Sequence, residues 1–126
     1  MGRAKEKKNL IDEIIRYQND LKEKYGFDWD NVFGVVDKLK EETRELEEVL
    51  LNNDSDKIEE EFGDILITIV NLSRFLKLDI NDVLNKSFIK FKKRVQKMKK
   101  EAQKEKINLE KLDISELDKL WDESKK

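Results

Sequence analysis

The 126-residue sequence predicts an all-α fold, and three features of its composition point that way. It contains no proline and only 4 glycines, so few positions interrupt a helix. Charged residues make up 44% of the chain, which is typical of long helices with solvated faces. The apolar residues recur at helical spacing. We therefore expect a helical bundle of four main helices plus a short C-terminal helix, within a single domain over residues 9–126.

The first two helices are expected over residues 9–25 and 31–51, where apolar residues recur every three or four positions. Gly26 ends the first of them, because glycine readily takes the left-handed conformation that follows a helix. Residues 27–30 form a linker with two aromatic side chains. Residues 1–8 are polar, and we expect a flexible N-terminal segment there.

The third helix is expected to begin with a capping box of Asp56 and Glu59 and to end near Leu76. Between positions 62 and 73 its only formal charge is Asp64. A helix that is apolar nearly all round is buried, so this one is expected to pack inside the bundle or against a second subunit.

The fourth helix is expected over residues 80–104, with Asp79 as its N-cap. An irregular stretch over residues 107–114 follows. Ser115 and Asp118 then predict the start of a short final helix.

Two amino acids are missing altogether, and this limits the chemistry. Without cysteine the chain has no disulfide, thiolate metal site or cysteine nucleophile; without histidine it has no Ser-His-Asp triad and no histidine-ligated zinc. Carboxylates and lysines remain for acid-base and metal chemistry. Because we find neither a secretory segment nor a transmembrane run, we expect a cytoplasmic protein with no membrane partner.

Charge is distributed unevenly along the chain. Residues 37–64 contain 12 acidic and 4 basic residues, whereas residues 86–106 contain 10 basic and 2 acidic ones. An acidic and a basic wall together suit a metal ion and a polyphosphate. The alternative is that the basic helix face simply pairs with the acidic helices. Few aromatic residues lie among the lysines and the pI is acidic, so we do not expect a nucleic-acid partner.

Two acidic clusters stand out on the second and third helices. Glu41, Glu42 and Glu45 share a face at helical spacing, and so do Glu61 and Asp64. Such like charges repel one another unless a cation holds them, and Mg²⁺ or Mn²⁺ prefers oxygen ligands. Projected around the helices, these acids border the apolar stripes, and Asp64 in its apolar run most needs a partner. Metal-assisted phosphoryl or nucleotidyl hydrolysis fits this arrangement.

A wider pattern resembles the MazG family of nucleoside triphosphate pyrophosphohydrolases over almost the full length. The motifs that carry the resemblance are Gly26-Phe27-Asp28-Trp29, Gly34-Val35-x-Asp37-Lys38, Lys38-x-x-Glu41-Glu42-x-x-Glu45, Glu61-Phe-Gly-Asp64, Val70-Asn71-Leu72, Lys90-Phe91-x-x-Arg94 and Trp121-x-x-x-Lys125. Together they are similar to the C-terminal type of domain in that family.

The resemblance implies an Mg²⁺-dependent homodimer, with Mn²⁺ as a substitute, that cleaves a nucleoside triphosphate into the monophosphate and pyrophosphate. The five acids would form the metal and water-activating centre, with four of them as metal ligands: Glu42, Glu45, Glu61 and Asp64. Implied substrate contacts are Lys38, Asn71, Lys90, Arg94, Trp121 and Lys125. Trp121 has an alternative reading as a cap on the core, since Leu117 and Leu120 lie at helical spacing from it.

Two departures from the family pattern are visible. Well-known members carry two such domains in tandem, whereas this chain has room for one, and Phe88 stands where an asparagine often precedes the helix-four lysine. Two other functions stay open: a related all-α pyrophosphatase specialised for dUTP or phosphoribosyl-ATP, and a non-catalytic helical module whose charged segments pair between subunits.

Overall fold

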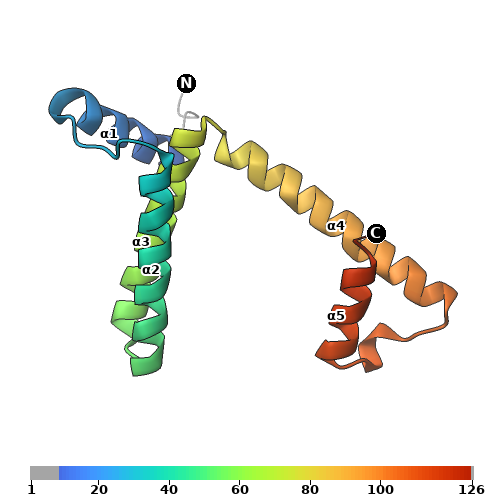
Figure 1. The fold of residues 1–126 in the computed structure, drawn as a ribbon. Coiled ribbons are helices and arrows are strands. Elements are labelled where there is room, and N and C mark those ends of the chain that lie inside the picture. The colour runs from blue at the N-terminus through green and yellow to red at the C-terminus, as the bar shows by residue number, and fades with distance from the viewer. Residues whose placement is uncertain (1–8, 126) are drawn as a thin grey trace, which may run out of the picture. The chain divides into compact units, whose positions relative to one another are not determined.

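The computed structural model describes residues 9–125, shown in Figure 1. Within that range the chain forms five α-helices and a short 3-10 helix, with no strand, so the all-α prediction is confirmed. The segment over residues 1–8 that was expected to be flexible lies outside the described part. The chain divides after Ile80 into two compact units, which are described one at a time. A single domain and a four-helix bundle stay predictions.

The first unit consists of α1 (Leu10–Tyr25), α2 (Val32–Asn52) and α3 (Ser55–Leu76). A two-residue turn joins α2 to α3, and the two helices pack along each other, while α1 packs against α3 (Figure 1). These bounds agree with the predicted ranges to within one residue, except at the start of α3, which begins two residues earlier than predicted. The acidic clusters expected on the second and third helices therefore lie on two adjacent helices.

Polar caps explain where these helices begin. Asn9 Oδ1 accepts a hydrogen bond from the Ile11 N–H at 2.8 Å, and Asn31 Oδ1 accepts one from Phe33 at 2.9 Å. The predicted capping box of the third helix is wrong, because Asp54 is the N-cap instead. Asn53 ends α2 in the left-handed conformation (φ 57°), and this turn places the next residue in the extended geometry that an N-cap needs.

The second unit consists of α4 (Ile80–Lys104, whose first residue belongs to the first unit), η2 (Leu109–Lys111) and α5 (Ile114–Glu123). The bounds of α4 match the predicted range of 80–104. The predicted start of the last helix at Ser115 is wrong. Asp113 and Glu116 form its capping box, because the chain already turns helical at Ile114.

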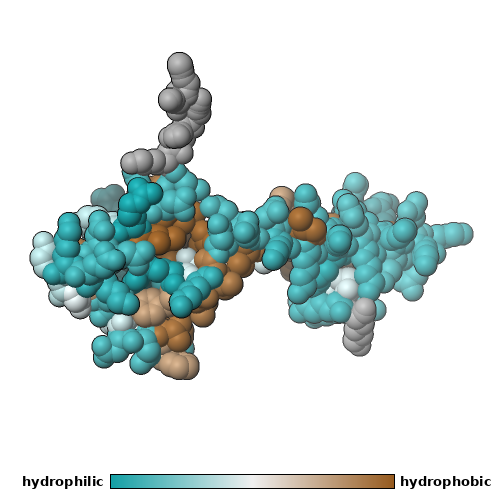
Figure 2. All heavy atoms as spheres, turned by 90° about the horizontal axis from the view of Figure 1, so that it is seen from above, coloured by the Kyte–Doolittle hydropathy of each residue, from teal (hydrophilic) through white to brown (hydrophobic). Residues whose placement is uncertain are grey.

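Few large side chains are buried within one chain. Val35 is fully buried and Val70 is 6% exposed, whereas much of α3's apolar surface stays open. The large apolar residues of α3 that are at least one-third exposed are Phe62, Leu66, Ile67, Ile69 and Leu76. Figure 2 shows hydrophobic surface, in brown, among the charged surface. Burial of α3 on nearly all sides is thus not achieved within the first unit. Among the described helices, none has the length and apolarity needed to cross a bilayer.

Candidate functional site

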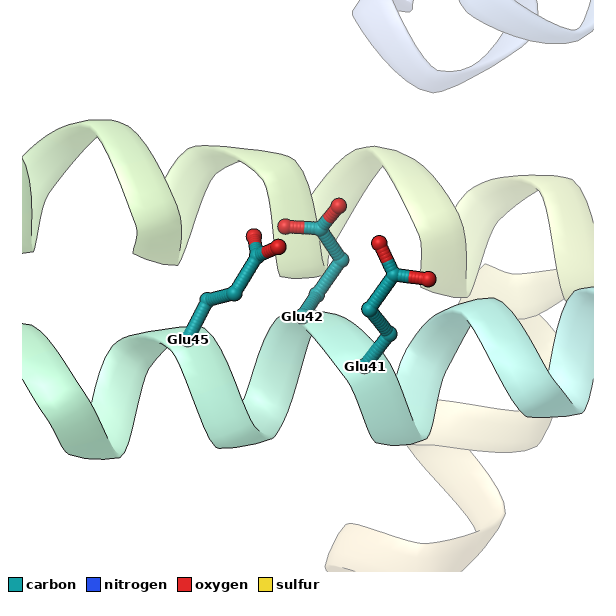
Figure 3. Close-up of side chains that lie close together, drawn as sticks. All are labelled: Glu41, Glu42 and Glu45. Atoms are coloured by element: carbon teal, nitrogen blue, oxygen red, sulfur yellow. The ribbon is translucent and has the colours of Figure 1, made fainter.

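Three carboxylates of the first acidic cluster leave α2 on the side that faces α3 (Figure 3). Glu41, Glu42 and Glu45 each offer an oxygen within 4.8 Å of the others. The spacing causes this, because positions four apart are one turn apart on a helix. The structure thus places these predicted site residues together.

A second group of carboxylates joins α2 to α3. Glu42, Glu61 and Asp64 also offer oxygens within 4.8 Å of one another. Glu42 belongs to both groups, so the five predicted acids form two overlapping groups that share one buried residue. Asp64 itself is exposed, which corrects the expectation that it is buried among apolar neighbours.

Glu42 is only 5% exposed and is held by a lysine one turn away. Lys38 Nζ lies 2.9 Å from Glu42 Oε1 and 3.4 Å from Glu41 Oε1. The hydrogen bond from Lys38 lowers the pKa of Glu42, outweighing the opposing effect of burial, and it raises the pKa of Lys38 in return. Lys38, an expected phosphate contact, is therefore paired with carboxylates in this structure.

Glu61 shows that the cluster holds more negative charge than its lysine balances. Burial raises the pKa of Glu61 to about 7, and the carboxylates of Glu42 and Glu45 push it in the same direction. Glu42 Oε2 and Glu61 Oε2 are both buried, and neither has a hydrogen-bond partner among the described residues.

These two orphaned oxygens test whether a metal ion suits the site. Every candidate ligand is a carboxylate oxygen, the donor type that Mg²⁺ and Mn²⁺ prefer, and a cation would satisfy both oxygens at once. Asp64 on the exposed side leaves room for water and substrate beside the ion. The residues present therefore fit a hard divalent cation. The carboxylate oxygens that are buried without a partner belong to Glu42 and Glu61, not to Asp64 as expected.

The predicted contacts on α4 and α5 lie within the second unit. The Arg94 guanidinium stacks 3.8 Å from the centre of the Trp121 ring, and its Nη2 donates to the Trp121 carbonyl oxygen at 3.2 Å. Phe91 packs against the same ring, with 5.2 Å between ring centres. Lys125 Nζ lies 3.6 Å from Asp122 Oδ1. In this unit Trp121 thus packs against α4, in line with its alternative reading.

Lys90 belongs to a basic groove along α4. The groove has a volume of about 380 Å³, and its lining residues are Lys86, Ile89, Lys90, Lys93, Arg94 and Lys97. Their spacing puts five cations along one side of a single helix. Such a row suits phosphate oxygens, and it follows directly from the lysine-rich pattern of the sequence.

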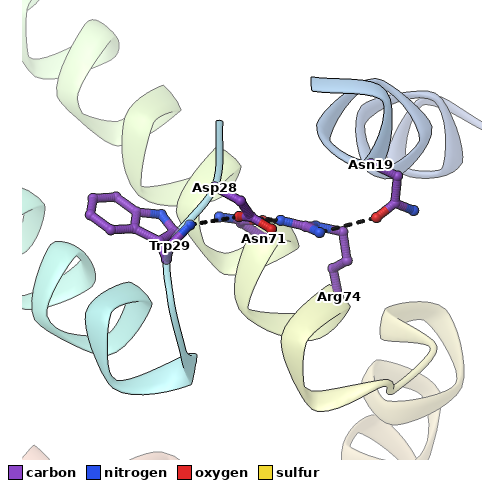
Figure 4. A network of polar contacts seen from close by, with 5 residues as sticks. All are labelled: Asn19, Asp28, Trp29, Asn71 and Arg74. Carbon is purple, nitrogen blue, oxygen red and sulfur yellow. Dashed lines mark hydrogen bonds and ion pairs between the residues drawn. The ribbon is translucent and has the colours of Figure 1, made fainter. Parts of the chain in front are cut away.

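Asn71 belongs to a polar network that the sequence reasoning missed (Figure 4). Arg74 donates from Nη2 to Asp28 Oδ1 at 2.6 Å, from Nε and Nη2 to Asn71 Oδ1 at 3.0 and 2.8 Å, and from Nη1 to Asn19 Oδ1 at 3.0 Å. The Arg74 and Asp28 side chains are 10% and 6% exposed. In the sequence, the linker motif around Asp28 was the one feature that pointed to this network, and it did not indicate which residue pairs with the Asp28 carboxylate.

Comparison with known proteins gives the family. A family profile described as the MazG nucleotide pyrophosphohydrolase domain matches residues 35–99, which include both acidic clusters and the basic part of α4. The chain is 45% identical over 100 residues to the nucleoside triphosphate pyrophosphohydrolase/pyrophosphatase MazG of Thermotoga maritima; the match covers 79% of this chain and 38% of that protein.

The chain is also similar to two further proteins. The chain is 31% identical over 106 residues to the nucleoside triphosphate pyrophosphohydrolase of Escherichia coli K12, covering 80% of this chain and 39% of the relative. It is also 37% identical over 65 residues to the uncharacterized protein YabN of Bacillus subtilis, covering 52% and 13%. The chain thus matches less than two-fifths of the length of each relative. With a family profile matched over more than half of its residues, the chain belongs to the MazG nucleotide pyrophosphohydrolase family.

Proposed function

We propose that the chain is an Mg²⁺-dependent nucleoside triphosphate pyrophosphohydrolase, which cleaves between the α- and β-phosphates. The observation that carries this proposal is the proximity of Glu42 and Glu61 on adjacent helices, where each has a buried oxygen without a hydrogen-bond partner in the described part of the chain. The printed names of the relatives from Thermotoga maritima and Escherichia coli support the same activity. We further propose a cytoplasmic role in removing excess or non-standard nucleotides.

Four carboxylates would hold the cation: Glu42, Glu45, Glu61 and Asp64. Mg²⁺, when bound, supplies positive charge to the phosphate oxygens and lowers the pKa of a bound water. Glu41 lies beside two of these residues, Glu42 and Glu45, and its side chain is 47% exposed. Because it is not one of the four proposed ligands, Glu41 would accept the proton of the attacking water.

We assign Lys38 a role toward both the carboxylates and the substrate. Its ammonium group pairs with Glu42 and Glu41 in the structure. Once Glu42 shares its charge with a cation, Lys38 loses part of this attraction and can turn toward a phosphate oxygen. For Asn71, Lys90, Arg94, Trp121 and Lys125, the role of substrate contact rests on the family resemblance.

Homodimerisation belongs to the same proposal, because the first unit leaves large apolar side chains of α3 uncovered. Leu66 is 47% exposed, and placing a charge there would oppose burial against a second copy. Light scattering coupled to gel filtration is expected to show a dimeric wild type and a monomeric Leu66→Glu variant. A monomeric wild type would contradict this part of the proposal.

Pyrophosphate release tests the activity. Glu42→Ala, Glu45→Ala and Asp64→Ala are each expected to abolish release while the protein keeps its helical content. Glu48→Ala is the matched control, because Glu48 is an exposed glutamate on α2 that belongs to neither carboxylate group. Turnover like that of wild type in all three variants would refute the proposed centre. A panel that includes dUTP and phosphoribosyl-ATP separates a broad activity from a specialised one.

A further inference from the structure

The first unit contains a cavity of about 820 Å³ beside the acidic cluster. This volume is within the range of small-molecule sites, roughly 300–1,000 Å³. Most of its wall is apolar or aromatic, and the principal residues of that wall are Ile14, Tyr17, Leu21, Phe27, Trp29 and Ile67. A flat, apolar ligand would fit such a wall better than an ion or a sugar would.

Trp29 is fixed as one side of this cavity. Its backbone N–H donates to Asp28 Oδ1 at 2.9 Å. Its ring lies over α2 at Gly34, where an added Cβ would meet the ring at 3.4 Å. Trp29 is 43% exposed and lines the cavity, so part of its surface is available to a ligand.

Two residues that line the cavity each carry a buried oxygen with no hydrogen-bond partner among the described residues: Asp28 Oδ2 and Gln18 Oε1. The Asp28 side chain is 6% exposed, and its other oxygen, Oδ1, already accepts from Arg74 and from the Trp29 N–H (Figure 4). A buried acceptor without a donor is unfavourable. A ligand that brings two N–H donors would satisfy both oxygens.

The cavity is also connected to the carboxylate groups. Lys38 lines it, and Lys38 Nζ lies 2.9 Å from Glu42 Oε1. Thr68 lines it too, and its hydroxyl donates to the Asp64 backbone oxygen at 2.8 Å. One molecule with a flat apolar end and an anionic end can therefore reach from the cavity to the proposed metal centre.

We infer that this cavity binds the base of the nucleoside triphosphate and selects bases that carry an amino group. The inference rests on the proposed function and adds Asp28 and Gln18 as specificity-determining residues. The amino groups of adenine and cytosine, and the adjacent N–H groups of guanine, each offer two donors to two acceptors. Uracil and thymine offer a single N–H between two carbonyl oxygens, which would face the Asp28 carboxylate unfavourably.

Rates of pyrophosphate release from GTP, ATP, CTP, UTP and dTTP test the selection. For wild type we expect kcat/KM to be about tenfold or more higher for the three amino-bearing bases, as expected when one buried acceptor is left unpaired. Asp28→Asn keeps an oxygen for Arg74 and turns the free acceptor into a donor, so the preference is expected to shift toward UTP. Gln18→Met removes the second acceptor and leaves the contacts of Arg74 intact. It should reduce the difference in kcat/KM between amino-bearing bases and uracil or thymine, whereas the control Gln103→Met on α4 should leave that difference unchanged.

A binding experiment tests base selection by the cavity independently of hydrolysis. In the isotope-labelled full chain without Mg²⁺, guanosine is expected to shift the indole N–H signal of Trp29 at concentrations where thymidine does not. The backbone amide signal of Glu48, an exposed residue outside both carboxylate groups, serves as the internal reference. Equal shifts by both nucleosides, or none, together with equal release from all five triphosphates, would overturn the inference and leave the proposed function standing. Selective guanosine binding without any pyrophosphate release would support the cavity and refute the hydrolase.

Discussion

Replacing Glu42 by glutamine removes the one carboxylate that both acidic groups share. The amide can still accept from Lys38, whose Nζ lies 2.9 Å from Glu42 Oε1 in the wild type. Losing the negative charge also relieves Glu61, whose pKa is raised partly by Glu42. Because Lys38 is 35% exposed, the lost ion pair is screened by water, and we expect the metal-free stability to change by less than about 1 kcal/mol.

The response to metal should change far more. A cation present at about 100 times its Kd stabilises the folded state that binds it by about 2.7 kcal/mol. For a chain of this length, 1 kcal/mol corresponds to about 4 °C in Tm, so Mg²⁺ should raise the wild-type Tm by about 10 °C. In Glu42→Gln the increase in Tm caused by Mg²⁺ should largely disappear, because each group is left with two of its three carboxylates.

Thermal unfolding followed by circular dichroism, with and without MgCl₂ at matched ionic strength, measures this difference. Calorimetry on the wild type first sets the Mg²⁺ concentration relative to Kd. Glu48→Gln, on the exposed part of α2, should respond to Mg²⁺ as the wild type does. Equal stabilisation of Glu42→Gln and wild type by Mg²⁺ would refute the assignment of a shared metal ligand.

Three further predictions concern stability alone. The pKa of Glu61 is raised to about 7, so folding favours its protonated form, and the metal-free protein should lose stability as the pH rises from about 4.5 to about 7. Urea unfolding at a series of pH values should show this loss in the wild type and not in Glu61→Gln. Arg74→Ala leaves the buried Asp28 carboxylate without its cation and should lower the free energy of unfolding by about 3–5 kcal/mol in urea; a change within about 0.5 kcal/mol would contradict the buried pair. Gly63→Ala, with no atom within 4 Å of the added Cβ, should stabilise α3 by about 0.5–1 kcal/mol in thermal unfolding; a loss of stability would mean that another surface packs there.

The sequence predicted the helices well, because each has a strong apolar period and a polar or glycine stop. It predicted the caps of α3 and α5 less well. Several cap-forming residues lie in a row at both starts, and the preceding turn decides which of them becomes extended: Asn53 leaves Asp54 to cap α3, and Asp113 precedes the helical Ile114. Local composition does not contain that information.

Of the site, the sequence predicted which acids lie together but not which of them is buried. The sequence pattern predicted that apolar residues surround Asp64. Burial, however, depends on which neighbouring helix covers each face, and in the structure Glu42 is buried whereas Asp64 is exposed. The Arg74–Asp28 pair was missed for a similar reason. Its members are 46 positions apart, and a charge on a helix does not by itself indicate its partner in space.

Product analysis of a single reaction tests the central claim most directly. Wild-type protein, incubated with a nucleoside triphosphate and Mg²⁺, is expected to release the monophosphate and pyrophosphate in equal amounts. The reaction should stop when a chelator removes the metal and should be absent in Glu42→Gln. Formation of the diphosphate with inorganic phosphate, or equal pyrophosphate release with and without Mg²⁺, would contradict a carboxylate-held metal centre for cleavage between the α- and β-phosphates.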